Sequence, residues 1–346
     1  MCISLNLTLV QLFDLMKLTI RSVPKSGPEW AGHRNFKMRM GKIDTHHHYF
    51  PKVYVDAVGW DMLAAAMPNG KAPDWSVEAA LQMMDANGIA EAILSVSAGP
   101  RIPNAPTLLR KCNDYGTGLR SQHPGCFGLF ASLPLPEVDA ALEEVRYCTE
   151  QLDADGFIVF ASYEERYLGD ELFTPLWEEL NRRKSIVFIH PSQPPYSIPR
   201  VAPASVLEFP FETTRAATSL IISGVLSRFK DIRFILSHAG GTLPFLAPRI
   251  ALSISMMPGV TERYGDPMAS LRSFYFDTAL SAGDATLSAL VKVTDPSHIL
   301  FGSDFPFAPA SAIRHFGEVL EHTALPGFER PGVYRGHAAQ LLERGA

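Results

Sequence analysis

The sequence predicts an α/β protein, a (β/α)8 barrel of the TIM type preceded by an N-terminal extension. The chain has 346 residues, a length that suits one such barrel with insertions. From Lys42 onward, short apolar runs alternate with longer amphipathic stretches. The rival fold, a doubly wound open sheet, is disfavoured because no glycine-rich loop follows the first run. We expect residues 1–40 to form the extension and residues 41–346 a single barrel domain.

The runs expected to be strands are rich in β-branched and aromatic residues and end in polar ones. Continuous apolar runs of this kind are typical of parallel strands that are buried on both faces. They are residues 42–48, 91–97, 126–134, 156–162, 185–191, 233–240, 274–280 and 298–306.

Helical periodicity separates these runs. The first such stretch, residues 75–88, has Ser76 as its expected N-cap and ends at Gly88. A further helix is expected to end at His123. The other stretches are residues 136–152, 169–184, 206–229, 243–256, 284–293 and 311–322.

The first 40 residues differ from the rest. The stretch 5–20 is apolar-rich, but Asp14 and Lys17 interrupt it, so it is too short and too polar for a membrane span. It also lacks the basic segment that begins a secretory signal. We expect a poorly ordered extension, with Met38 or Met40 as an alternative start; an amphipathic arm that packs on a partner is the other interpretation.

Composition excludes several function classes. The net charge is −5 and the basic residues are scattered, which argues against nucleic-acid binding. The four cysteines show no CxxC spacing, so neither a disulfide scaffold nor a thiolate metal site is expected. A reducing, cytoplasmic location and no membrane association follow as expectations.

Ionisable residues fall at the ends of the expected strands, where barrel enzymes carry their active sites. Side chains alternate along a strand, so His46 and His48 share one face while His47 takes the other. His190 and Asp304 end the fifth and eighth strands. Imidazole and carboxylate ligands suit Zn²⁺, and also Mn²⁺ or Fe²⁺. A lone buried histidine is usually a core residue, but the coincidence of several strand ends favours a metal site.

Four motifs, in this order, resemble the amidohydrolase superfamily: DTHHH, FIHPSQPP, ILSHAGGTLPFLAPRI and ILFGSDFPF. The resemblance spans about residues 42–342 and is narrower to the metal-dependent decarboxylase branch. That branch includes aminocarboxymuconate-semialdehyde, γ-resorcylate and 6-methylsalicylate decarboxylases, and residues 75–97 are most similar to the last of these.

The resemblance implies roles for individual residues. His46, His48, His190 and Asp304 become metal ligands, and His238 with Asp304 becomes the catalytic acid/base pair. From position alone, His238 is a ligand or a free base. Binuclear relatives carry a bridging lysine on the fourth strand, and residues 156–162 contain none. A single divalent ion is therefore implied, with zinc expected and manganese as the alternative.

Four residues are candidates for substrate binding. The resemblance implies that Arg249 reaches the neighbouring subunit of a homodimer and binds a substrate carboxylate; the alternative is an ordinary surface arginine. Arg101, after the second strand, is a second anion-binding candidate. Phe50 and Phe307 would line an aryl pocket, or simply pack.

The implied reaction is non-oxidative decarboxylation of a small carboxylic acid, aromatic (salicylate-type) or muconate-like. The metal-bound substrate would be protonated at carbon before CO2 leaves. Two alternatives stay open, because a fold does not determine function. They are a metal-dependent hydrolase of a lactone, amide or ester, and a non-catalytic barrel.

Overall fold

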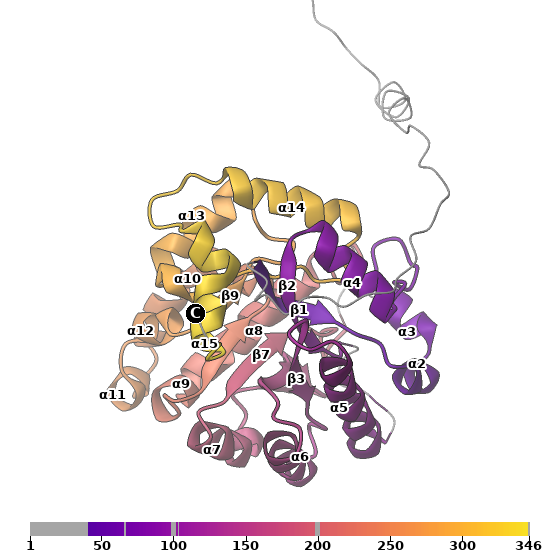
Figure 1. Cartoon of the computed structure of the whole chain (residues 1–346). Helices are drawn as coiled ribbons and strands as arrows, with labels where there is room; N and C mark the ends of the chain where they lie inside the picture. The colour runs from indigo at the N-terminus through magenta and orange to yellow at the C-terminus, as the bar shows by residue number, and fades with distance from the viewer. Residues whose placement is uncertain (1–40, 66, 98–101, 103, 198–200, 345–346) are drawn as a thin grey trace, which may run out of the picture. The chain divides into compact units, whose positions relative to one another are not determined.

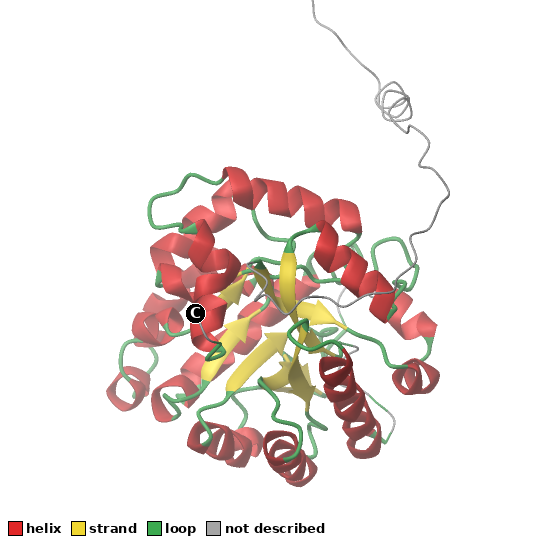
Figure 2. Cartoon of the chain, viewed as in Figure 1, coloured by secondary structure: helices red, strands yellow, loops and turns green. Residues whose placement is uncertain are grey.

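A computed structural model describes residues 41–65, 67–97, 102, 104–197 and 201–344. The expected extension, residues 1–40, lies outside the described residues. The described residues form an eight-stranded parallel sheet surrounded by helices, as Figures 1 and 2 show. Its strands follow in the order β1 (Lys42–His48), β2 (Ile89–Ser95), β3 (Phe127–Ser132), β4 (Gly156–Phe160), β7 (Ile186–His190), β8 (Arg233–Leu236), β9 (Tyr275–Asp277) and β10 (Ile299–Leu300).

The first strand and the segment after the last strand close the ring. Backbone N–H groups of Thr45 and His48 donate to the carbonyls of Phe301 (3.0 Å) and Phe305 (2.7 Å). The N–H of Asp304 donates in the other direction, to the carbonyl of His46, at 2.8 Å. The predicted (β/α)8 barrel is therefore confirmed.

The eighth expected strand is much shorter than residues 298–306. Regular pairing with β9 covers Ile299 and Leu300, after which single hydrogen bonds to β1 take over. Asp304 adopts a left-handed backbone, with φ of 61°, which a regular strand cannot accommodate. The sixth and seventh strands also end earlier than expected, at Leu236 and Asp277.

Helices follow most strands on the outside of the barrel (Figure 2). Ser76 caps its helix as expected, since its side chain accepts a hydrogen bond from the N–H of Ala79. The α-helices of the described residues are α2 (Lys52–Val58), α3 (Trp60–Ala65), α4 (Val77–Ala86), α5 (Ala105–Gln122), α6 (Val138–Glu150), α7 (Thr174–Arg182), α8 (Glu208–Ile222), α9 (Val225–Arg228), α10 (Leu243–Ser255), α11 (Val260–Tyr264), α12 (Pro267–Arg272), α13 (Asp284–Val293), α14 (Ala310–His322) and α15 (His337–Leu341).

The helix expected over residues 206–229 is broken in two. Gly224 takes a left-handed backbone, φ 73°, between α8 and α9. A short antiparallel hairpin of β5 (Ser162–Tyr163) and β6 (Arg166–Tyr167) follows β4. Among the described residues, no helix combines the length and apolar character that crossing a membrane requires.

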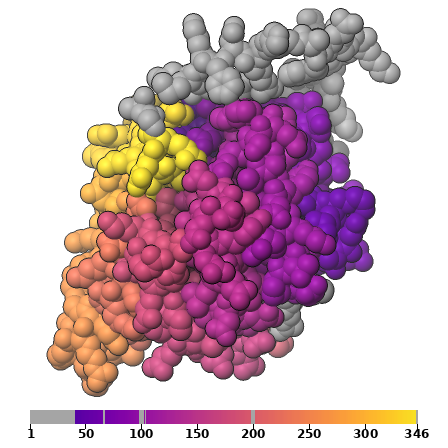
Figure 3. Space-filling model, turned by 60° about the horizontal axis from the view of Figure 1, so that its bottom comes forward, coloured from indigo at the N-terminus to yellow at the C-terminus, as the bar shows by residue number. Residues whose placement is uncertain are grey.

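The interior of the barrel is filled by apolar side chains below the strand ends. Ile43, Phe130 and Phe188 are fully buried in this cluster, and Leu341 and Leu342 from the C-terminal segment pack against it. In Figure 3 the C-terminal segment, coloured yellow, lies against segments from the first half of the chain. Because the interior is filled, a substrate has access only from the opposite end, where the strands terminate.

Candidate metal centre and substrate cavity

Four side chains from three strand ends meet at one point inside the barrel. His46, His48, His190 and Asp304 are all buried, and one ligand atom of each lies within 4.8 Å of the other three. The Nε2 atoms of His46 and His48 are 3.0 Å apart. Oδ1 of Asp304 lies 3.2 Å from the first and 3.3 Å from the second.

Each imidazole has its other nitrogen engaged by a neighbour. Nδ1 of His46 donates to Oδ2 of Asp277 at 2.8 Å. Nδ1 of His48 lies 3.0 Å from the hydroxyl of Ser95, and Nδ1 of His190 donates to the carbonyl of Pro191 at 2.8 Å. With the proton held on Nδ1, the lone pair of each Nε2 faces the common point, as metal-binding histidines require.

The donor atoms fit a divalent cation. Zinc–nitrogen bonds of 2.0–2.1 Å in a tetrahedral site place neighbouring ligand atoms about 3.3 Å apart, close to the distances from Asp304 to His46 and His48. Oδ1 of Asp304 is buried and accepts no hydrogen bond from the described residues. A buried carboxylate oxygen without a donor is costly, and a cation at the common point would satisfy it.

The pKa values of the residues in this cluster are shifted in different directions. Burial lowers the pKa of His48 to about 4, and burial also holds the pKa of His190 well below its ordinary value. For His46 burial opposes the charge, but the carboxylates of Asp277 and Asp304 outweigh it and raise its pKa to about 10. Burial would raise the pKa of Asp304, yet His46 and the other imidazoles hold it well below the ordinary value. Without an ion the cluster thus offers two neutral imidazoles and an ionised carboxylate, and its carboxylates hold a proton on His46 that a bound cation would displace.

Two buried aspartates, Asp44 and Asp277, hold the loops that carry the ligands. Oδ1 of Asp277 accepts from the N–H groups of His238 (3.1 Å) and Ala279 (2.8 Å). Asp44 accepts from the N–H and the hydroxyl of Ser303, at 2.9 and 2.6 Å. We did not foresee these roles of Asp44 and Asp277 from the sequence. The signal available was that both are carboxylates inside strands that must be buried.

His238 lies beside the cluster rather than in it. It begins the 3-10 turn η2 (His238–Gly240) after β8, with a left-handed backbone, φ 53°. Its Nε2 is 3.4 Å from Oδ2 of Asp304, while its buried Nδ1 has no hydrogen-bond partner among the described residues. Strained backbone at two adjacent functional positions, here and at Asp304, is characteristic of active sites.

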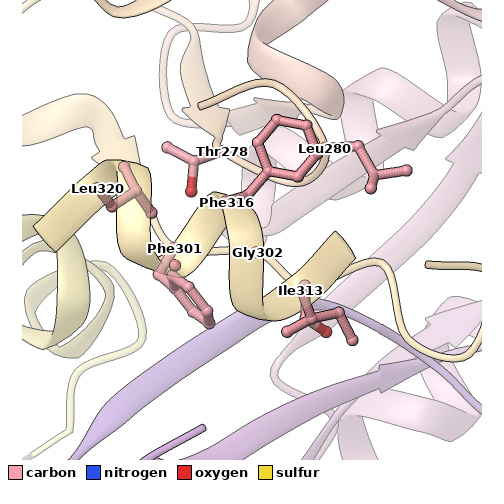
Figure 4. A pocket seen from close by; sticks show the side chains of 9 residues that line it. Thr278, Leu280, Phe301, Gly302, Ile313, Phe316 and Leu320 are labelled. Atoms are coloured by element: carbon pink, nitrogen blue, oxygen red, sulfur yellow. The ribbon is translucent and has the colours of Figure 1, made fainter. Parts of the chain in front are cut away.

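A cavity of about 930 Å³ opens above these residues. His190, His238 and Asp304 line its inner end, and Phe307 and Ser97 lie beside them. Its volume lies within the range of small-molecule binding sites. By contrast, the space under α14 in Figure 4, lined by Thr278, Phe316 and neighbouring residues, holds only about 10 Å³, room for about one water.

The expected substrate-binding residues lie in different places. Phe307 lines the cavity and packs edge-on against His48, with ring centroids 5.3 Å apart. Phe50 is buried and packs against Phe307, with ring centroids 5.5 Å apart. It is not among the described residues that line the cavity. Arg249 is exposed on α10 and is not among the described residues that line this cavity. Arg101 lies outside the described residues.

One wall of the cavity is held by a buried carboxylate that we did not foresee from the sequence. The hydroxyls of Tyr167 and Tyr196 donate to Glu212 of α8 at 3.1 and 3.4 Å, and Arg215 donates at 2.9 Å. Tyr196 belongs to the loop that follows His190, and this loop lines the cavity. Burial raises the pKa of Glu212. The network fixes the loop against α8.

Comparisons with known proteins agree with this geometry. A family model described as Amidohydrolase matches residues 43–344. The 6-methylsalicylic acid decarboxylase of Aspergillus aculeatus is 40% identical over 320 residues, covering 88% of this chain and 96% of the relative. The 6-methylsalicylic acid decarboxylase of Penicillium expansum is 38% identical, covering 88% and 97%.

A solved structure of 2,6-dihydroxybenzoate decarboxylase, in complex with 2,6-dihydroxybenzoate, superposes with a TM-score of 0.73. It is 25% identical and covers 88% of this chain and 99% of its own. The resemblance inferred from the four motifs is thereby confirmed, and these named relatives are decarboxylases.

Proposed function

This chain belongs to the amidohydrolase family, and we propose that it is a metal-dependent, non-oxidative decarboxylase of a salicylate-type aromatic acid. The observation that carries the proposal is the cluster of three imidazoles and one carboxylate at the inner end of a large cavity. Relatives that are 38–40% identical and named for the same reaction class support it.

We propose one divalent ion at this cluster, zinc as the expected ion and manganese as the alternative. Strand β4, with the sequence GFIVF, carries no lysine that would bridge a second ion. When bound, the ion would hold the carboxylate and the ortho hydroxyl of the substrate together and polarise the ring.

The protein's own residues supply the proton. Oδ2 of Asp304 and Nε2 of His238, 3.4 Å apart, can share one proton beside the inner end of the cavity. Transfer of that proton to the ring carbon that bears the carboxylate forms a C–H bond and interrupts aromaticity. The C–C bond then breaks, its electron pair returns to the ring, and CO2 leaves. His238 is 11% exposed and takes up the next proton from solvent.

The test compares two reactions in one protein. We expect CO2 release from 6-methylsalicylate by protein loaded with zinc or manganese, and no release of acid from aryl lactones. His238→Gln should lower kcat by about 10²–10⁴-fold, whereas His315→Gln, an exposed histidine on α14, should leave it unchanged. Lactone hydrolysis without CO2 release from any salicylate would overturn the proposal in favour of a hydrolase.

We also propose that the enzyme is a homodimer in which Arg249 serves the neighbouring site, and that it is cytoplasmic. Arg249 lies on α10 near Phe245 and Leu252, whose side chains are 83% and 64% exposed. Exposed apolar residues along one helix are typical of an interface. An arginine fork suits a substrate carboxylate.

Mixed dimers test the shared site. Arg249→Ala and His238→Ala should each be inactive alone, whereas hybrids of the two should regain activity, because one of the two sites is then intact. Arg146→Ala, an exposed arginine on α6, serves as the matched control. Verified hybrids that stay inactive, or a monomer in solution, would contradict this arrangement.

A further inference from the structure

The cavity is larger than the reaction alone requires. At about 930 Å³ it lies near the upper end of the range for drug-sized ligands, about 300–1,000 Å³. A salicylate ring held at Asp304 and His238 fills only the inner end.

The two ends of the cavity differ in chemistry. The inner end carries His190, His238 and Asp304, together with Ser97 and Ser192. A second part of the lining, called the outer end below, comes from α3 with the loop after it and from the start of α8. Its apolar lining residues include Met62, Leu63, Met67, Pro68, Ala72 and Phe209.

The outer end suits an apolar group. Methionine side chains are flexible and polarizable, so a wall that contains two of them adapts to chains of different length. The charged lining residues Lys71 and Glu164 are at exposed positions, so their charges are hydrated at the rim. The six apolar side chains offer no hydrogen-bonding group, so burying a charged or strongly polar tail against them would cost free energy that no hydrogen bond to them offsets.

We propose that the preferred substrates are salicylate-type acids that bear an extended alkyl chain on the ring, with the chain lying against Met62 and Met67. This inference rests on the proposed decarboxylase function and adds the class of ring substituent. An alkyl chain in the outer end leaves the carboxylate and hydroxyl at the inner end undisturbed. Each methylene removed from water contributes a binding gain of roughly three- to fourfold.

The experiment measures kcat/KM for CO2 release from a series of 6-alkylsalicylates, with methyl, propyl, pentyl and heptyl chains. We expect kcat/KM to rise by roughly two- to fourfold per methylene as far as pentyl, chiefly through KM. Met67→Trp, which fills the outer end, should lower the pentyl-to-methyl ratio of kcat/KM by about tenfold. Leu172→Trp, at an exposed position outside the cavity, is the matched control.

The possible outcomes distinguish a failure of this inference from a failure of the decarboxylase proposal. CO2 release from the methyl acid that stays constant or falls with chain length overturns this inference and leaves the decarboxylase proposal standing. CO2 release from none of the acids overturns both. Should Met67→Trp fail to fold, Met62→Ala replaces it: the wider outer end should shift the optimum to longer chains, and an unshifted optimum counts against the inference.

Discussion

The two ends of the barrel use charged side chains in opposite ways. At the end where the strands begin, Arg344 lies between two carboxylates: Nη2 is 2.5 Å from Oδ1 of Asp155, and Nε donates to Glu91 at 3.0 Å. The other oxygen of Asp155 accepts from the N–H of Leu129 at 2.7 Å. At the end where the strands terminate, the imidazoles of His46, His48 and His190 converge on the carboxylate of Asp304 instead.

The difference lies in whether the protein satisfies its own polar groups. Around Arg344 each carboxylate has a donor, so the network is complete and stabilises the closed barrel. Around Asp304 the Nε2 atoms of His46 and His48 face one another at 3.0 Å, and Oδ1 has no hydrogen-bond partner among the described residues. An incomplete network costs stability, and a cation completes it. We infer that one end stabilises the fold while the other binds.

The largest effect should come from Asp304→Asn. The amide removes the negative ligand and the proton carrier, so we expect kcat for CO2 release to fall by about 10³-fold. In metal-free protein the free energy of unfolding should change by less than about 2 kcal/mol, because a costly buried charge disappears with its attractions. Assay of CO2 release and urea unfolding measure the two quantities.

The exposed Asp231→Asn is the control for this substitution. If Asp304→Asn kept more than a tenth of the activity, or unfolded the protein outright, the binding role assigned to this end would be wrong.

At the opposite end of the barrel, Arg344→Ala should lower the stability of the fold and leave kcat almost unchanged. It leaves Asp155 and Glu91, both largely buried, without their shared cation, and we expect a loss of about 2–3 kcal/mol in the free energy of unfolding. The kcat of the folded fraction should stay within about twofold of wild type. Urea unfolding and kcat, measured well below the midpoint of unfolding, test both. A loss of kcat with unchanged stability would contradict the division between the two ends.

The smallest effect is expected at a partly exposed cluster of ion pairs on the surface of the barrel. On α7, hydrogen bonds from Arg182 and Arg183 lower the pKa of Glu179 to about 2. Because solvent screens this site, Glu179→Gln should cost only about 0.5–1 kcal/mol at pH 7. A lowered carboxyl pKa contributes stability above the unfolded pKa, about 4.3, and loses it as the pH falls towards 2.

Urea unfolding of wild type and Glu179→Gln at several pH values between 7 and 3 checks the sign. The difference between them should shrink as the pH falls below about 4.5. A difference that grew on acidification would show that the carboxylate is not the stabilising form.

The ligands at the strand ends were predictable because each one follows an apolar run that can be recognised in the local sequence. The four proposed ligands end three apolar runs, and the barrel brings such ends together whatever lies between them. Helix α13 has the bounds expected from its periodicity, Asp284–Val293. Helix α5 was not delimited beyond its end, because Pro106, Gly116 and Gly118 weaken its helical pattern.

The supporting contacts could not be predicted, because they join residues far apart in the sequence. The hydrogen bond from His46 to Asp277 spans 231 positions, and that from Ser303 to Asp44 spans 259. No local pattern records which carboxylate faces which imidazole. The same holds for the left-handed backbone at His238 and Asp304, which the surrounding contacts impose against local preference.

The most direct test of the central claim is anomalous diffraction from crystals of the protein loaded with zinc or manganese. We predict one ion per chain, with Nε2 of His46, His48 and His190 and a carboxylate oxygen of Asp304 each within about 2.0–2.3 Å of it. An ion bound elsewhere, or fully active protein whose anomalous map shows no ion at these four residues, would contradict the account.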